Sequence, residues 1–90
     1  MGNRSRTDIV AMILEAANGG ETKTKIMYFA FLSYNQVKEY LSVLIENNVI
    51  EYLDGAKTFK TTEKGLFFLK MHNEMGELLQ STTNKTNQLI

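Results

Sequence analysis

Four polar side chains stand close together in the segment "LSYNQVKEYL": Ser33, Tyr34, Asn35 and Lys38. An Asn amide places a donor beside an acceptor, which matches the edge of an adenine base, and a Lys ammonium can reach a guanine acceptor or a phosphate. A Tyr hydroxyl can donate to a phosphate. These residue types indicate contact with a nucleic acid, provided that the fold presents them together on one surface.

The segment that carries them has the pattern of an amphipathic helix. Ser33 followed three residues later by Gln36 is a capping box, which predicts the helix start. The apolar face is formed by Val37, Tyr40, Leu41, Leu44 and Ile45. The opposite face is formed by Asn35, Lys38, Glu39, Ser42 and Glu46. We expect the helix to end near residues 47 and 48, two asparagines that can adopt a left-handed cap.

Two shorter helices are predicted before this one. Ser5 with Asp8 has the form of a capping box and starts a helix over residues 6–18, which the glycines at 19 and 20 end. The next helix has Thr22 or Thr24 as its cap. Its inward residues are Ile26, Met27 and Ala30.

A β-hairpin and a fourth helix follow. The dipeptide Asp54-Gly55 lies between two runs of β-formers and predicts a two-residue turn that pairs Leu53 with Ala56. Thr62 then caps a helix over residues 63–80. We expect the first apolar residues of that helix, Leu66, Phe67 and Leu69, to complete the core.

The predicted fold is therefore mainly α with a two-stranded β-hairpin, in the order helix, helix, helix, hairpin, helix. This is the winged helix-turn-helix arrangement. We expect a flexible N-terminus over residues 1–5, the winged helix-turn-helix domain over 6–62, a C-terminal helix over 63–80 and a flexible tail over 81–90.

The segment "KTKIMYFAFLSYNQVKEYLSVLIENNVI", followed by "TEKG" at residues 62–65, also resembles a known group of proteins. It is similar to the small archaeal winged helix-turn-helix DNA-binding regulators, and most of all to the small chromatin-associated proteins of archaea that dimerise through a C-terminal helix. The resemblance implies binding of double-stranded DNA without catalysis.

In a helix-turn-helix the second helix of the pair enters the major groove, and its first residues lie nearest to the bases. Helix starts can also bind phosphate, and lysines on a hairpin wing can contact the DNA backbone. The predicted DNA-binding residues are Lys23, Lys25, Ser33, Tyr34, Asn35, Lys38, Lys57 and Lys60. The alternative is that Ser33 is only a cap and that the lysines are solvated charges. Arg4 and Arg6 form either a basic arm or an ordinary chain end.

The last helix predicts a dimer. Its apolar residues after the core contact follow a 3-4-3 spacing, as in a coiled coil, with a further leucine beside them. The predicted interface consists of Phe68, Met71, Met75, Leu78 and Leu79. The alternative is that this seam packs back on the first helix. His72, in the middle of the same helix, is expected to face solvent or the seam.

Composition limits the other classes of function. The chain of 90 residues has ten basic and ten acidic residues, no cysteine and one histidine. We therefore expect no enzyme, cofactor, metal site or small-molecule ligand, no membrane span, and a cytoplasmic, nucleoid-associated protein. Because the net charge is zero, a winged helix that binds other proteins rather than DNA remains the alternative.

Overall fold

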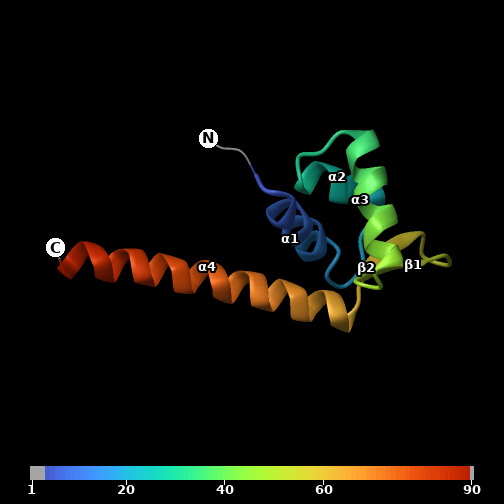
Figure 1. Cartoon of the computed structure of the whole chain (residues 1–90). Helices are drawn as coiled ribbons and strands as arrows, with labels where there is room; N and C mark the ends of the chain where they lie inside the picture. Colours follow the sequence, from blue (N-terminus) through green and yellow to red (C-terminus); the bar gives the residue numbers. More distant parts are fainter. Residues whose placement is uncertain (1–3, 90) are drawn as a thin grey trace.

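The computed structural model describes the backbone of residues 4–89 and the side chains as far as residue 79. Six elements follow one another: α1 (Arg6–Ala16), α2 (Lys23–Phe29), α3 (Tyr34–Glu46), β1 (Ile50–Leu53), β2 (Thr58–Thr61) and α4 (Glu63–Leu89). This is the predicted order of three helices, an antiparallel hairpin and a fourth helix. The first five elements gather around the beginning of α4, and the rest of α4 extends away from them as a rod (Figure 1).

Helices α1 and α3 begin at the predicted capping boxes. The Ser5 hydroxyl accepts the N–H of Asp8 at 3.0 Å, and the Asp8 carboxylate accepts the N–H of Ser5 at 3.2 Å. Ser33 and Gln36 make the same pair of bonds at 3.2 and 2.9 Å. Each box pairs two backbone donors that a helix start otherwise leaves open, so both predictions are confirmed. In α2 the cap is Thr22, which accepts the N–H of Lys25.

The core lies between α1, α2, α3 and the hairpin. Its fully buried residues include Ile13, Leu14, Ile26, Val37 and Ile50. Helix α1 ends at Ala16, two residues before the expected end, and the two glycines that follow have φ angles of 93° and 105°. The expected burial of Ile45 was wrong, because this residue lies one step around the helix from the buried Leu44 and faces outward.

The hairpin has a longer loop than the sequence predicted. Leu53 pairs with Thr58 rather than with Ala56, so residues 54–57 form a four-residue loop. The N–H of Lys57 donates to the carbonyl of Asp54 at 3.3 Å, and Lys57 has a φ of 55°. The left-handed residue is therefore Lys57, whereas the predicted two-residue turn requires positive φ at Asp54 and Gly55.

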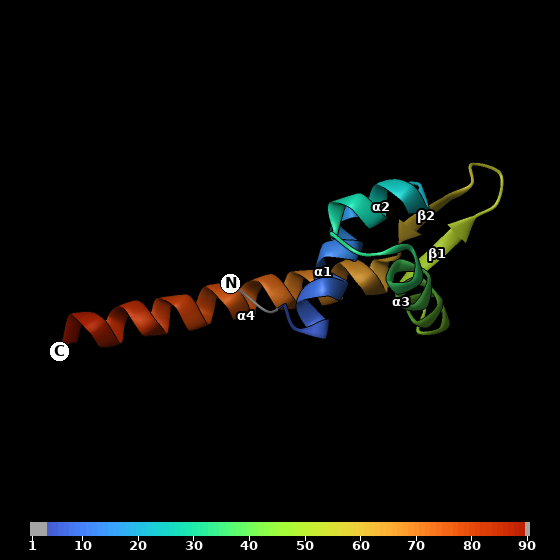
Figure 2. The ribbon, with the colours of Figure 1, turned by 90° about the horizontal axis from the view of Figure 1, so that it is seen from above.

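The base of the hairpin is joined to the chain between α1 and α2. Glu21 and Phe59 exchange backbone hydrogen bonds of 2.8 and 2.7 Å in an isolated antiparallel bridge. The hydroxyl of Thr61, the buried polar residue of the core, donates to the carbonyl of Leu14 at 2.7 Å. These bonds orient the hairpin relative to α1, and its loop projects away from the helices (Figure 2).

The start of α4 passes very close to the end of α3. Thr62 caps α4 as predicted, accepting the N–H of Gly65 at 3.1 Å. A Cβ added to Gly65 would lie 2.1 Å from the carbonyl oxygen of Val49 and 2.7 Å from Cγ2 of Thr61. Only glycine therefore allows this close approach of the two backbones.

The core-facing side of α4 differs from the predicted one. Phe67 is 65% exposed, so its expected placement in the core was wrong. Phe68, which was expected in the outer seam, is partly buried against the core of its own chain. His72 lies one turn after Phe68 and contacts α1, with its Nε2 3.1 Å from Oδ1 of Asp8. The expectation that His72 faces solvent or the seam was also wrong. The packing of α4 against α1 selects the face, which spacing alone cannot reveal.

Helix α4 continues well past the expected end. It runs to Leu89, whereas a flexible tail was expected over residues 81–90; Ile90 lies outside the described residues. No proline or glycine follows Gly76, and extending an existing helix is much easier than starting a new one. Polar composition alone was therefore a poor guide to the helix end.

Candidate nucleic-acid interface

The outward face of α3 is the surface on which the predicted polar residues meet. On the opposite side of the helix, Val37, Leu41 and Leu44 are buried in the core. Asn35 and Lys38 are exposed on the other side, and Ser33 is exposed at the cap. The buried residues recur at i, i+4 and i+7, so the remaining part of the helix circumference faces outward.

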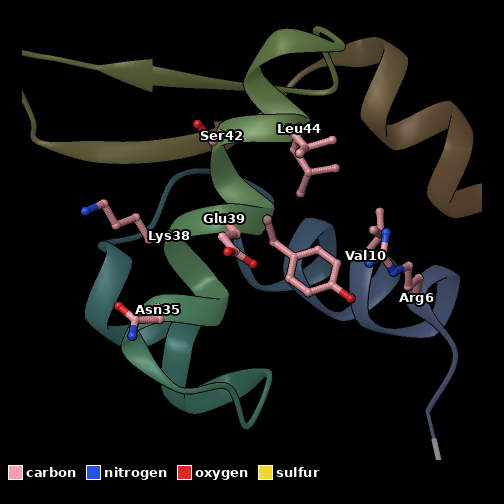
Figure 3. A pocket seen from close by; sticks show the side chains of 9 residues that line it. Arg6, Val10, Asn35, Lys38, Glu39, Ser42 and Leu44 are labelled. Carbon is pink, nitrogen blue, oxygen red and sulfur yellow. The ribbon is translucent and has the colours of Figure 1, made fainter.

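A shallow open groove of about 800 Å³ follows this face of α3 and reaches α1. In Figure 3 Asn35 and Lys38 point away from α1, and Glu39 lies between them and the α1 residues Arg6 and Val10. The lining residues are Arg6, Val10, Asn35, Lys38, Glu39, Tyr40, Ser42, Val43 and Leu44. The predicted site omitted Arg6, Glu39, Ser42 and Val43, although the helical spacing from Asn35 already placed the last three on the same face.

Tyr34 and Lys23 form a pair between the starts of α3 and α2. The ammonium of Lys23 donates to the Tyr34 hydroxyl at 3.3 Å and lies 4.6 Å from the centre of its ring. This hydrogen bond, together with the positive charges of Lys23 and Lys38, lowers the pKa of the Tyr34 hydroxyl. The pair holds a positive charge beside the first turn of α3, where the helix dipole also favours an anion.

Lys25 is not brought to the same surface. Two residues along a helix are separated by about 200° around its axis, so Lys25 projects from α2 on the side opposite to Lys23. Its ammonium lies 3.8 Å from the Glu21 carboxylate, and it lines a small hollow between α1 and α2 with Glu15 and Phe29. An exposed pair of this kind contributes little stability, but it does offset the charge that a phosphate would meet.

The two wing lysines lie apart from the α3 surface. Lys57 is in the loop at the tip of the hairpin, and Lys60 lies on β2 opposite Glu51 of β1. Both side chains are exposed. They can reach a DNA backbone only if the duplex spans the distance between α3 and the wing.

Arg4, expected to belong to a flexible N-terminus, is bonded to the rest of the fold. The Arg4 guanidinium donates to the carbonyl of Ala30 and, at 3.0 Å, to that of Phe31. These carbonyls lie at the C-terminal end of α2, where a helix leaves acceptors open and a cation is favourable. Arg4 and Ser5 are therefore held by α2 and α1, and residues 1–3 lie outside the described part of the chain.

The outer face of α4 is a second exposed surface, and it is apolar. Phe67, Met71, Met75 and Leu78 recur at spacings of four, four and three residues and are 65%, 42%, 60% and 66% exposed. Helical spacing places all four on one side, which we call the apolar stripe. Of the predicted interface, Met71, Met75 and Leu78 belong to it. Leu79 lies at its edge and is also exposed.

Two other features are absent from the described part of the chain. Within it, no cluster of three or more histidine, aspartate or glutamate side chains is arranged to hold a metal ion. No helix among the described residues is long and apolar enough to cross a membrane.

Comparison with known proteins places this geometry in a family. Residues 3–80 match the winged helix-turn-helix family. An uncharacterized protein of Methanocaldococcus jannaschii, MJ0290, is 35% identical over 77 residues, which make up 84% of this chain and 36% of that protein. The chain thus spans about a third of the length of this relative.

A solved structure has the same architecture along nearly the whole chain. Sso10a-2, a DNA-binding protein from Sulfolobus solfataricus, is similar with a TM-score of 0.71 and 22% identity, and the likeness covers 97% of each chain. At this identity the likeness shows the fold. Since the family match covers most of the residues and the order of elements agrees with it, the chain belongs to the winged helix-turn-helix family.

Proposed function

We propose that the protein binds double-stranded DNA as a transcription regulator, with α3 in the major groove and the hairpin wing on the DNA backbone. The observation that carries this proposal is the outward face of α3. It presents Asn35 and Lys38 to solvent from a helix that the core holds rigid behind them. A rigid helix of this kind can enter the major groove without losing conformational freedom.

The chemistry of the first turn supports this orientation. Asn35 can pair with an adenine edge, and the Lys23–Tyr34 pair can receive a phosphate beside the start of α3. The DNA-binding activity named for Sso10a-2, which shares the fold, gives further support. A regulator that acts by binding DNA needs no catalytic group, and it would reside at the nucleoid in the cytoplasm.

We further propose that two copies associate through α4. The apolar stripe offers Met71, Met75 and Leu78 at a spacing that two helices can share as a seam. A two-fold dimer of this kind would bring two α3 helices to one duplex. Helix α4 has 27 residues, about 40 Å of length, so it reaches far beyond its own domain.

A salt titration tests the proposal for DNA. If each chain neutralises about four phosphates, a plot of log affinity against log salt should have a slope near −4, which doubles for a dimer. The measurement is a gel shift or anisotropy titration of a duplex at several salt concentrations. Absence of binding at low salt would refute DNA binding and favour the alternative, a winged helix that binds another protein, for which zero net charge is no handicap.

A further inference from the structure

The centre of the α3 surface is acidic, although its flank carries Lys38. Asn35, Glu39, Ser42 and Glu46 follow one another at spacings of four, three and four residues, so they form one row along the exposed face. Lys38 is displaced by about 100° from Glu39 around the helix. A helix entering a groove by its first turns would therefore direct Glu39 toward the bases, with Glu46 farther along the same row.

The Glu39 carboxylate is not neutralised by a neighbour. Among the side chains that the structure describes, none forms a hydrogen bond or an ion pair within 4.0 Å with Glu39. The positions three and four residues away on α3 are occupied by uncharged residues, the nearest of them Asn35 and Ser42. Arg6 lines the same groove from α1 but makes no such pair.

An unpaired carboxylate at this place weakens any binding that relies on phosphate attraction alone. It becomes favourable only against a hydrogen-bond donor, since a carboxylate is purely an acceptor. In the major groove, guanine and thymine present acceptors, and adenine presents its amino group beside the N7 acceptor. Cytosine alone presents an amino donor without an acceptor of its own next to it.

We propose that Glu39 is a specificity-determining residue that accepts a hydrogen bond from the amino group of a cytosine in the major groove. This inference rests on the proposed DNA binding and deepens it. The protein then selects a sequence instead of coating DNA, which agrees with a net charge of zero: the general electrostatic attraction is weak, and base contacts supply the affinity.

The test compares Glu39→Gln with Glu46→Gln. Both variants remove one negative charge from the same exposed row, but Glu46 lies in the last turn of α3, farther from the helix start that faces the bases. Duplexes are first selected from a random pool with the unaltered protein. Binding of both variants is then titrated on the selected duplex, on a version with the critical cytosine pair replaced, and on unselected duplex.

We expect Glu39→Gln to weaken binding to the selected duplex by about tenfold and to move the preference at that position from cytosine to adenine. The second effect arises because a Gln amide matches the adenine edge. Glu46→Gln should strengthen binding to all duplexes alike. The slope against salt should be unchanged in Glu39→Gln, since no phosphate contact is lost.

Two results separate this inference from the function on which it rests. If Glu39→Gln strengthens binding to every duplex equally, as Glu46→Gln does, Glu39 only repels phosphate and the inference is overturned while DNA binding stands. If the unaltered protein shifts no duplex at low salt, the proposed function itself fails. A selected sequence without a cytosine whose replacement lowers affinity would also overturn the inference.

Discussion

Helices α3 and α4 each leave one side exposed, but the two sides differ in chemistry. The face of α3 carries Asn35, Lys38 and Glu39, groups that remain hydrated until they meet hydrogen-bonding partners. The face of α4 carries large apolar side chains such as Phe67 and Met75. Large apolar side chains exposed side by side often mark an interaction surface, whereas a polar helix face is ordinary.

The difference supports the two kinds of partner proposed above. A hydrated polar face suits DNA, whose groove edges and phosphates are themselves polar and hydrated. An apolar face suits another protein surface, and a second copy of the same helix is the simplest complement. Substitutions that act on one face and leave the other unchanged therefore test the two proposed partners separately.

The largest effect is expected on the apolar stripe. Met75→Glu places a charge in each half of the proposed seam and should convert the dimer fully to monomers of 10.3 kDa. Light scattering at high micromolar concentration measures the mass. Asn73→Glu, on the opposite side of α4, adds the same charge and should leave the dimer intact. A mass of one chain for the unaltered protein would contradict the dimer.

The next effect concerns how α4 is joined to the domain. Gly65→Ala should lower the free energy of unfolding by about 1–3 kcal/mol, because the new Cβ meets the Val49 carbonyl oxygen. Thermal unfolding checks this, at about 4–8 °C for each kcal/mol in a chain of this size. Gly76→Ala is the control: a Cβ there meets nothing within 4 Å, and the variant should be more stable by up to about 1 kcal/mol.

A smaller effect, on the polar face alone, is expected for Lys38→Glu. Reversing this exposed charge should weaken DNA binding by about tenfold without lowering the melting temperature, because the side chain supports no packing. Lys70→Glu makes the same change of charge on α4 and should bind nearly as well as the unaltered protein. Equal binding by both variants would remove Lys38 from the interface.

The smallest effect is expected at the contact of α1 with α4, which belongs to neither exposed face. The hydrogen bond from His72, followed by those within the Ser5 capping box, lowers the pKa of Asp8. A carboxyl with a lowered pKa stabilises the fold above its unfolded pKa of about 3.9 and loses this contribution as the pH falls through its folded pKa.

Asp8→Asn should therefore lower the melting temperature slightly at pH 7, and the difference from the unaltered protein should shrink as the pH falls through the folded pKa of Asp8. Melting curves between neutral pH and pH 3 measure this. Asp54→Asn, at the wing tip, should show no such dependence. A difference for Asp8→Asn that stayed the same from neutral pH to pH 3 would assign the effect to packing instead of charge.

Local signals in the sequence predicted much of the fold. The two capping boxes at Ser5 and Ser33 depend on residues three apart, and both formed as expected. The buried positions of α3 also followed from spacing, except at Ile45, where the helix leaves the core. Such features depend on contacts within one or two turns, which neighbouring residues determine.

Features that no short sequence motif specifies were missed. The pairing of Leu53 with Thr58 follows from the whole loop over residues 54–57, not from the Asp-Gly dipeptide. Phe68 packs against the core in place of Phe67 because of how α4 lies on α1, and this contact joins segments far apart in the chain. The spacing predicted which residues of α3 are exposed, but it did not reveal that Glu39 lines a groove between α3 and α1.

The bond from Arg4 to the end of α2 has a practical consequence. It joins the first described residue to the bend between α2 and α3, so anything fused ahead of it is attached next to the segment from which α3 starts. An affinity tag joined there without a spacer would disturb the hydrogen bonds of Arg4 to that bend. Work on DNA affinity should use an untagged chain or a cleavable leader that leaves the guanidinium unhindered.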